Sequence, residues 1–270
     1  SRLLWHCPPM DEIFPTHYRP VAASFFFRHP AWFLVLPLSL LLLFTRSALA
    51  DDQIREPSLI EVPGASTAYF YPPKRSSGPR PVIVYLHGRG GNPHDDCRKW
   101  SQVATEFGWL LCPSGQSAHG NGRSWSNSWP TAQHIVDASL EALHKSQGRR
   151  VQRTGNILIG FSEGAFAAQN IAVREPRVFN RWLILASSMK YWGQPGLQAL
   201  EENRRAIRRV VLLTGVLDPV APESREVYDA LRAQRVRSKL EIVQDMGHEV
   251  PSSRMRELYR PALRWLTSTR

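Results

Sequence analysis

The chain has 270 residues, a formal net charge of +11 at pH 7, and a composition of 43% hydrophobic and 21% charged residues. This apolar fraction excludes a disordered or collagen-like chain and suits one domain of ordinary size. Only three cysteines are present, which excludes a disulfide-rich miniature fold and leaves no Cys/His spacing typical of a zinc finger. We therefore expect a globular protein without a structural metal.

An uncharged apolar run of 14 residues, at 31–44, lies between Arg28 and the sequence Ala48-Leu49-Ala50. A basic flank, a short apolar stretch and an Ala-x-Ala ending are the parts of a secretory signal, and 14 residues make a short membrane span. Residues 1–50 are therefore predicted to be an N-terminal extension and signal peptide, cleaved after Ala50. The alternative is an uncleaved membrane anchor. Either interpretation predicts export to the periplasm or the extracellular space.

The segment that follows, residues 51–270, keeps most of the positive charge, because residues 1–50 contain four Lys/Arg and two acids. Such an excess can attract anionic polymers, but the arginines are scattered through helical patterns without the aromatic interleaving of a nucleic-acid motif. A solvated, Arg-rich surface is favoured, and no nucleic-acid partner is expected. In an oxidising compartment the remaining cysteines, Cys97 and Cys112, would form a disulfide; two buried free thiols are the alternative.

From Ser66 onward, short apolar runs ended by Gly, Pro or Ser alternate with helical patterns. Strands are predicted at 67–71, 82–86, 109–112, 156–159, 182–186, 210–214 and 240–244, and helices at 96–107, 131–146, 163–174, 195–208, 222–234 and 252–267. This alternation predicts a single α/β domain, with a mostly parallel central sheet and helices on both faces. The Gly-, Ser- and Trp-rich stretch 113–130 interrupts the pattern and is expected to be a loop that walls a binding cleft.

The fourth predicted strand runs into Gly160-Phe161-Ser162-Glu163-Gly164, which runs into a helix of small residues. A serine nucleophile has to project from a tight strand-to-helix turn, and glycines on either side leave room for that turn. The helix that begins after the serine also directs its first N–H groups toward a developing oxyanion. Ser162 is therefore the candidate nucleophile.

Another buried strand ends in the turn His87-Gly88-Arg89-Gly90-Gly91. Such a turn can direct backbone N–H groups at the site without side-chain obstruction, as an oxyanion loop does. A phosphate loop is the alternative interpretation, but the Gly-Lys-Ser/Thr ending of that motif is missing. His87 is interpreted as a residue that braces the loop.

The base and the acid are predicted at two further strand ends. Asp218 follows the strand at 210–214 and His248 follows the strand at 240–244, and residues beyond the carboxyl ends of parallel strands converge in one crevice. The order Ser, Asp, His agrees with a catalytic triad. Less favoured acids and bases are Asp245, Glu223, His94, His134 and His144. A substrate cleft is predicted at His119, Trp125 and Trp129.

These motifs resemble the α/β-hydrolases, from about Ser66 to the end of the chain. A fainter resemblance extends to secreted esterases similar to polyhydroxybutyrate depolymerases and feruloyl esterases, and to dienelactone hydrolases and lysophospholipases. The resemblance implies that the backbone N–H groups of Arg89 and Glu163 form the oxyanion hole. The chain departs from the family in the bulky Arg89, and it has no obvious helical lid of the kind that large lipases carry.

The combined signals predict a serine hydrolase that cleaves a carboxylic ester, small or polymeric, through an acyl-enzyme and without a cofactor. An exported serine peptidase and a cell-envelope acyltransferase would use the same triad. A non-catalytic binding protein on this scaffold would more often have lost a triad member, and all three are present. Membrane contact is expected only through an uncleaved N-terminal segment.

Overall fold

The computed structural model describes residues 55–75 and 77–269, which fall in the unit that runs from Asp52 to Arg270. The predicted signal peptide and its cleavage position lie outside the described residues. Among the described residues, no helix combines the length and apolar character needed to cross a bilayer.

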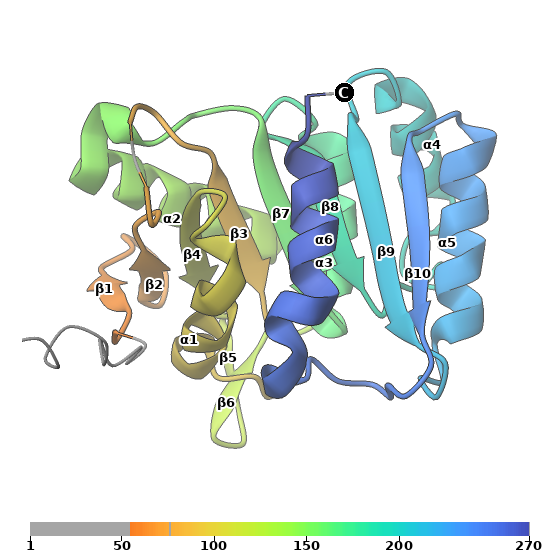
Figure 1. The fold of residues 1–270 in the computed structure, drawn as a ribbon, viewed down its shortest axis with the longest axis horizontal. Coiled ribbons are helices and arrows are strands. Elements are labelled where there is room, and N and C mark those ends of the chain that lie inside the picture. Colours follow the sequence, from red (N-terminus) through yellow and green to blue (C-terminus); the bar gives the residue numbers. More distant parts are fainter. Residues whose placement is uncertain (1–54, 76, 270) are drawn as a thin grey trace, which may run out of the picture. The chain divides into compact units, whose positions relative to one another are not determined.

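The observed strands and helices alternate along most of the chain (Figure 1). The strands are β1 (Ser58–Ile60), β2 (Ala68–Tyr71), β3 (Val82–Leu86), β4 (Trp109–Pro113), β5 (Ser117–His119), β6 (Gly122–Ser124), β7 (Asn156–Phe161), β8 (Phe179–Leu185), β9 (Arg209–Gly215) and β10 (Ser238–Val243). The α-helices are α1 (Pro93–Ala104), α2 (Trp129–Gln147), α3 (Glu163–Arg174), α4 (Gly193–Asn203), α5 (Ala221–Ala233) and α6 (Met255–Thr267). Short 3-10 helices lie at Gly148–Arg150 and Ser252–Arg254.

Eight strands form one sheet in the order β1-β2-β4-β3-β7-β8-β9-β10. The pairs from β4 to β10 are parallel, whereas β2 runs antiparallel to both β1 and β4. All residues of β3 and β9 are buried, as expected for strands covered on both faces. The parallel strands therefore end at one edge of the sheet, the lower edge in Figure 1, where the β5–β6 hairpin also lies.

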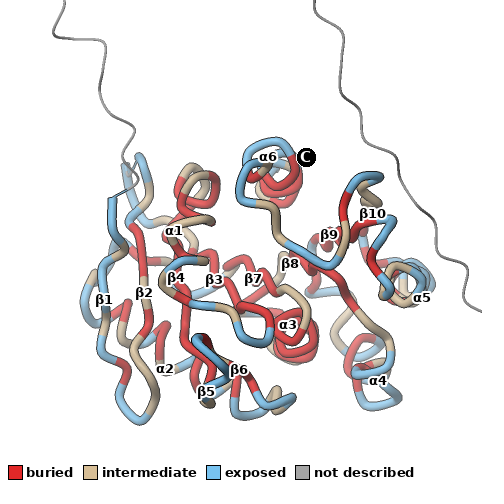
Figure 2. The backbone as a smooth tube through the Cα atoms, turned by 90° about the horizontal axis from the view of Figure 1, so that it is seen from below, coloured by how far each residue is buried: buried red, intermediate tan, exposed pale blue. Residues whose placement is uncertain are grey.

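Helices cover both faces of this sheet, which confirms the predicted fold class. Helices α1 and α6 pack on one face, and the other four helices lie on the opposite side (Figure 2). On the first face the rings of Trp100 and Tyr259 join α1 to α6, with centroids 4.7 Å apart. On the second face the apolar residues of α3, which is buried along almost its whole length, pack against the sheet. These two apolar layers exclude water from both sides of the sheet and fix the positions of its strand ends.

Helix α1 begins three residues before the predicted start, at Pro93. The Asn92 side chain accepts hydrogen bonds from the backbone N–H groups of His94 (3.0 Å) and Asp95 (3.4 Å), so it caps the helix. Proline suits the first helical turn because its missing N–H would have no partner there. The sequence Asn-Pro therefore carried a start signal that hydrophobic periodicity alone did not reveal.

Three other predictions of local structure need correction. The stretch 113–130 contains the β5–β6 hairpin and the first two residues of α2, and β1 was not predicted. These three strands have only three residues each, and β1 is mostly exposed, so no apolar run marks them. Helix α4 ends at Asn203, not at 208, because a turn closed by Ala206 N–H and the Asn203 carbonyl leads the chain into β9.

The structure brings Cys97 of α1 and Cys112 of β4 together as a disulfide. Their Cα atoms are 5.8 Å apart, a separation typical of bridged cysteines. The bridge links helix α1 to the sheet strand that follows it. Of the two alternatives left open by the sequence, the structure therefore contains the paired one.

Candidate active site

Ser162 lies on a tight turn between β7 and α3. Its backbone has φ 55° and ψ −117°, a left-handed conformation that non-glycine residues rarely adopt and that costs on the order of 1–3 kcal/mol. Glycine is required on both sides: a Cβ on Gly160 would lie 2.3 Å from the Gly164 carbonyl oxygen, and one on Gly164 would lie 2.2 Å from that of Leu86. Close packing of β3, β7 and α3 therefore holds the strained serine in place.

Ser162, His248 and Asp218 form a continuous line of hydrogen bonds. Ser162 Oγ lies 2.8 Å from His248 Nε2, and His248 Nδ1 lies 2.9 Å from Asp218 Oδ2. The three residues follow β7, β10 and β9, so the sheet places all of them at its C-terminal edge, as the sequence predicted. The geometry suits proton transfer from the serine to a histidine whose other nitrogen is held by a carboxylate.

Burial differs among these three residues. The Asp218 side chain is 1% exposed, whereas that of His248 is 40% exposed and open to solvent. The second carboxylate oxygen, Asp218 Oδ1, accepts a hydrogen bond of 3.0 Å from the backbone N–H of Val220. The Phe161 ring packs against the His248 ring, with centroids 5.0 Å apart. The acid is therefore fixed, and the histidine is held between a ring and the acid with one side accessible.

His87 braces the loop at the end of β3. Its Nδ1 lies 2.8 Å from the Gly88 carbonyl oxygen, and its Nε2 accepts a hydrogen bond of 3.1 Å from the backbone N–H of Gly115. These partners fix the neutral tautomer with the proton on Nδ1. The ring is 1% exposed and stacks on Trp125 with centroids 5.0 Å apart, and this burial lowers the pKa of His87. His87 is therefore a neutral structural group.

The side chains of Arg89 and Glu163 contact each other. Arg89 Nη2 and Nε lie 3.1 and 3.3 Å from Glu163 Oε1. The sequence singled out both residues for their backbone N–H groups and did not predict this ion pair. The opposite charges of two residues assigned to one oxyanion hole were the signal that could have predicted the pair.

The Glu163 carboxylate is buried and accepts several further hydrogen bonds. Ser124 Oγ donates to it at 2.9 Å, and the backbone N–H groups of Trp125 and Asn127 donate at 3.0 and 3.2 Å. Burial alone would raise the pKa of Glu163, but these hydrogen bonds and Arg89 outweigh it and lower the pKa below its usual value. Glu163 is therefore held as a carboxylate.

The residues predicted to line a substrate cleft have three different environments. Trp125 is fully buried and its indole N–H donates to the His87 carbonyl at 2.9 Å, so its side chain does not reach a cleft. Trp129 begins α2 and lies under the guanidinium of Arg174, 4.2 Å from the ring centroid. His119 is exposed and packs close to Gly90 of the oxyanion loop. Of the three, His119 is the exposed residue, and it lies beside the loop that follows β3.

No family model and no curated protein matches the sequence. Among solved structures, a carboxylesterase of Bacillus cereus has a TM-score of 0.55 at 18% identity, over 74% of this chain and 92% of its own. Esterase PE8 has a TM-score of 0.56 at 20% identity, over 77% of this chain and 100% of its own. A thermostable esterase from Pseudomonas putida ECU1011 has a TM-score of 0.59 at 16% identity, over 80% of this chain and 83% of its own.

These identities are low enough that the similarity concerns the fold alone. The sheet order, the helices on both faces and the three solved structures agree on that fold. The chain has the α/β-hydrolase fold. Because one fold can serve many functions, the chemistry of this α/β-hydrolase domain has to be argued from its own site.

The acids and histidines that were less favoured lie elsewhere in the hydrolase fold. His94 contacts Glu56 and Asp95, His144 Nε2 lies 3.1 Å from the Gln152 carbonyl oxygen, and Ser188 donates a hydrogen bond to Glu223. Asp245 is exposed in the loop before His248. In the described part of the chain, His, Cys, Asp and Glu side chains form no group of three or more suited to a metal ion.

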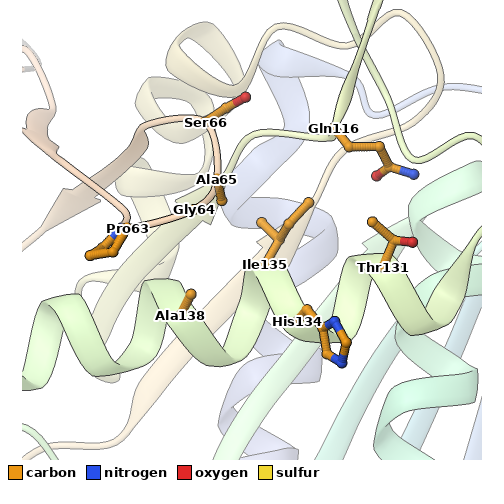
Figure 3. Close-up of a pocket in the computed structure, with 9 residues that line it drawn as sticks. All are labelled: Pro63, Gly64, Ala65, Ser66, Gln116, Thr131, His134, Ile135 and Ala138. Atoms are coloured by element: carbon orange, nitrogen blue, oxygen red, sulfur yellow. The ribbon is translucent and has the colours of Figure 1, made fainter.

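A cavity of about 610 Å³ lies between the loop after β1 and helix α2 (Figure 3). It is lined by backbone and small side chains around Gly64 and Ser66, together with Gln116, His134 and Ile135. Ser162, Asp218 and His248 do not line it. This cavity is therefore separate from the hydrogen-bonded line of Ser162, His248 and Asp218.

Proposed function

We propose that this protein is a serine hydrolase that cleaves a carboxylic ester through an acyl-enzyme intermediate. The observation that carries the proposal is the hydrogen-bonded line from Ser162 through His248 to Asp218, with the serine on a strained turn. A serine hydroxyl is a weak nucleophile, and it needs a base within hydrogen-bond distance and an acid that orients the base. Both requirements are met here.

In the proposed reaction, His248 Nε2 removes the hydroxyl proton as Ser162 Oγ attacks the ester carbonyl. His248 Nδ1–H donates to Asp218, which holds the imidazole in the required tautomer and stabilises the imidazolium that forms. The imidazolium then protonates the leaving alkoxide as the tetrahedral intermediate collapses. Water, activated by the same histidine, attacks the acyl-enzyme and releases the acid.

The oxyanion is proposed to be bound by the backbone N–H groups of Arg89 and Glu163. Glu163 is the first residue of α3, where the helix dipole and the unpaired N–H groups favour negative charge. The Gly88 backbone lies close to the nucleophile, because a Cβ added there would be 3.4 Å from Ser162 Cβ. Donors held in advance at this place stabilise the transition state more than the ground state.

Ester hydrolysis is preferred to peptide hydrolysis on two grounds. Three of the similar structures are described as a carboxylesterase and esterases. In this chain, the exposed apolar side chains of Val216 and Leu217 directly precede Asp218 at the same edge of the sheet, which suits a substrate with an apolar portion. We propose a small or polymeric ester, with His119 at the rim of its cleft, and a secreted esterase as the subclass.

Export is part of the same proposal. The pairing of Cys97 with Cys112 supports it, because disulfides persist in oxidising compartments and are rare in the cytosol. The measurement is fractionation of cells that express the full chain, with N-terminal sequencing of the product. We expect a periplasmic or secreted protein that begins at Asp51. Retention in the cytosol with the N-terminus intact would overturn this part.

The ester class is tested with a panel of p-nitrophenyl esters of graded acyl length, beside p-nitroanilides of the same acyl groups. We expect ester turnover that exceeds amide turnover by at least about 100-fold and that is lost in Ser162→Ala. An added acceptor alcohol should not divert most of the acyl group. Faster amide cleavage would favour a peptidase, and dominant transfer to the alcohol would favour an acyltransferase.

A further inference from the structure

The two residues proposed to supply the oxyanion N–H groups are also joined through their side chains. Arg89 and Glu163 are 74 positions apart, at the ends of β3 and β7, and their charged groups are 3.1 Å apart. The Glu163 side chain is 3% exposed and that of Arg89 is 48% exposed. The pair therefore connects the oxyanion loop to the turn that carries the nucleophile, with its acid buried and its base at the surface.

The same carboxylate also holds a third segment, the end of β6 and the chain that follows it. Ser124 Oγ, Trp125 N–H and Asn127 N–H all donate to Glu163. Ser126 and Asn127 have φ of 50° and 51°, left-handed values that non-glycine side chains disfavour. This backbone directs the N–H groups of Trp125 and Asn127 at the Glu163 carboxylate, and the Ser126 N–H at Ser124 Oγ. Three segments that are distant in the sequence therefore meet at one side chain.

A carboxylate at this position needs compensation. Glu163 directly follows the nucleophile, so its negative charge would oppose the oxyanion that develops beside its own N–H group. The guanidinium of Arg89 cancels much of that charge locally. The hydrogen bonds to the Glu163 carboxylate remain. The carboxylate therefore still orders the chain around it, while its repulsion of the oxyanion is reduced.

We propose that Arg89 and Glu163 are a positioning pair, whose side chains set the geometry of the oxyanion hole formed by their own backbones and neutralise the acid beside it. This rests on the proposed serine hydrolase function and deepens it. Arg89, the bulky residue in the oxyanion loop, thereby has a role, because its side chain braces the loop against α3. Neither side chain takes part in bond making.

The proposal is tested by a double-mutant cycle with Arg89→Gln, Glu163→Gln and the double variant. With an ester at saturating concentration, we expect each single substitution to lower kcat at least about tenfold while KM changes less than about threefold. The loss of kcat in the double variant should be at least about fivefold smaller than the product of the two single losses. The reason is that removing both charges leaves neither the guanidinium nor the carboxylate without its partner. A merely structural pair would not give this split between kcat and KM.

The exposed pair Arg153–Glu141, 3.2 Å apart, is the matched control. Its side chains are 69% and 66% exposed, and the same cycle with Arg153→Gln and Glu141→Gln should leave kcat within about twofold. Thermal unfolding of every variant is recorded in parallel. If Glu163→Gln fails to fold, Arg89→Gln and Arg89→Lys decide the question, because Glu163 keeps its other donors in both. Arg89→Lys should retain more of the wild-type kcat than Arg89→Gln.

Single substitutions that leave kcat within twofold, or losses that simply multiply in the double variant, would overturn the positioning pair. The proposed function stands apart from that result. It is decided by turnover in the wild-type protein and its loss in Ser162→Ala. An active wild type with unaffected Arg89 and Glu163 variants would reject only the pair, whereas an inactive wild type that also fails to react with a fluorophosphonate would reject both.

Discussion

The two edges of the central sheet carry charge in different ways. At the C-terminal edge, the buried acids Asp218 and Glu163 each have defined partners at hydrogen-bond distance. At the N-terminal edge, arginines precede or begin the strands, and Arg209, Arg237 and Lys239 lie 5.0–5.7 Å from the centre of the Trp265 ring. The first edge holds a few charges in fixed geometry, and the second gathers three cations around an aromatic ring.

The difference shows which kind of charge indicates function. At the N-terminal edge, burial and the neighbouring guanidiniums of Arg237 and Arg208 lower the pKa of Arg209, which is the expected result of crowding like charges. At the C-terminal edge, the strained backbone of Ser162 and the burial of the Asp218 carboxylate both cost folding free energy, and such costs are typical of functional sites. The net charge of +11 therefore says less about function than two buried carboxylates do.

The largest effect is expected from Asp218→Asn. An amide in this place would favour the wrong tautomer of His248, with the Nε2 proton facing the serine, so kcat should fall about 10⁴-fold. Circular dichroism and thermal unfolding check that the fold is retained. A loss of less than about tenfold would remove Asp218 from the triad and would weaken the contrast between the two edges.

A second prediction concerns the framework between the edges. Replacing Cys97 and Cys112 together by alanine should lower the free energy of unfolding by about 3 kcal/mol, because the bridge closes a loop with a sequence separation of 15. Urea denaturation under oxidising conditions measures the change, and reduction of the wild-type protein should reproduce it. Kinetic constants should stay near wild type. Two free thiols in the native wild-type protein would contradict this prediction.

His87 provides a pH test of burial at the C-terminal edge. A histidine whose pKa is lowered by folding adds stability that is complete above its unfolded pKa and declines as the pH falls below that value. Between about pH 8 and pH 5 the wild type should therefore lose on the order of 1 kcal/mol more stability than His87→Gln. Urea denaturation across that range gives both curves. Parallel curves would show that His87 is not held neutral.

The smallest effect is expected at the opposite edge, from Arg208→Gln. Arg208 is exposed, and its backbone N–H, which the substitution keeps, donates to the Asn180 carbonyl. The free energy of unfolding should change by less than about 0.5 kcal/mol, and kcat should be unchanged. Ester turnover and urea denaturation check both. A loss of activity comparable with that of Asp218→Asn would show that the two edges are not functionally distinct.

The sequence predicted the parallel strands and brought Ser162, Asp218 and His248 forward as candidates because their signals are local. Ser162 and Asp218 follow buried strands with continuous apolar runs, and His248 follows the edge strand β10, in which charged and apolar residues are mixed. By contrast, the ion pair of Arg89 with Glu163 joins residues 74 positions apart and depends on where two loops meet. Trp125 was placed in a cleft because its segment is rich in Gly and Ser, but its ring is buried against His87. Contacts between loops require the three-dimensional structure.

The most direct test of the central claim is the reaction of the protein with a fluorophosphonate probe, read by intact mass and peptide mapping beside Ser162→Ala. A serine activated by His248 should form a single adduct on the peptide that contains Ser162, and the Ser162→Ala variant should form none. That result would establish the nucleophile of the proposed hydrolase. A well-folded wild type that forms no adduct, or one labelled elsewhere, would contradict the account.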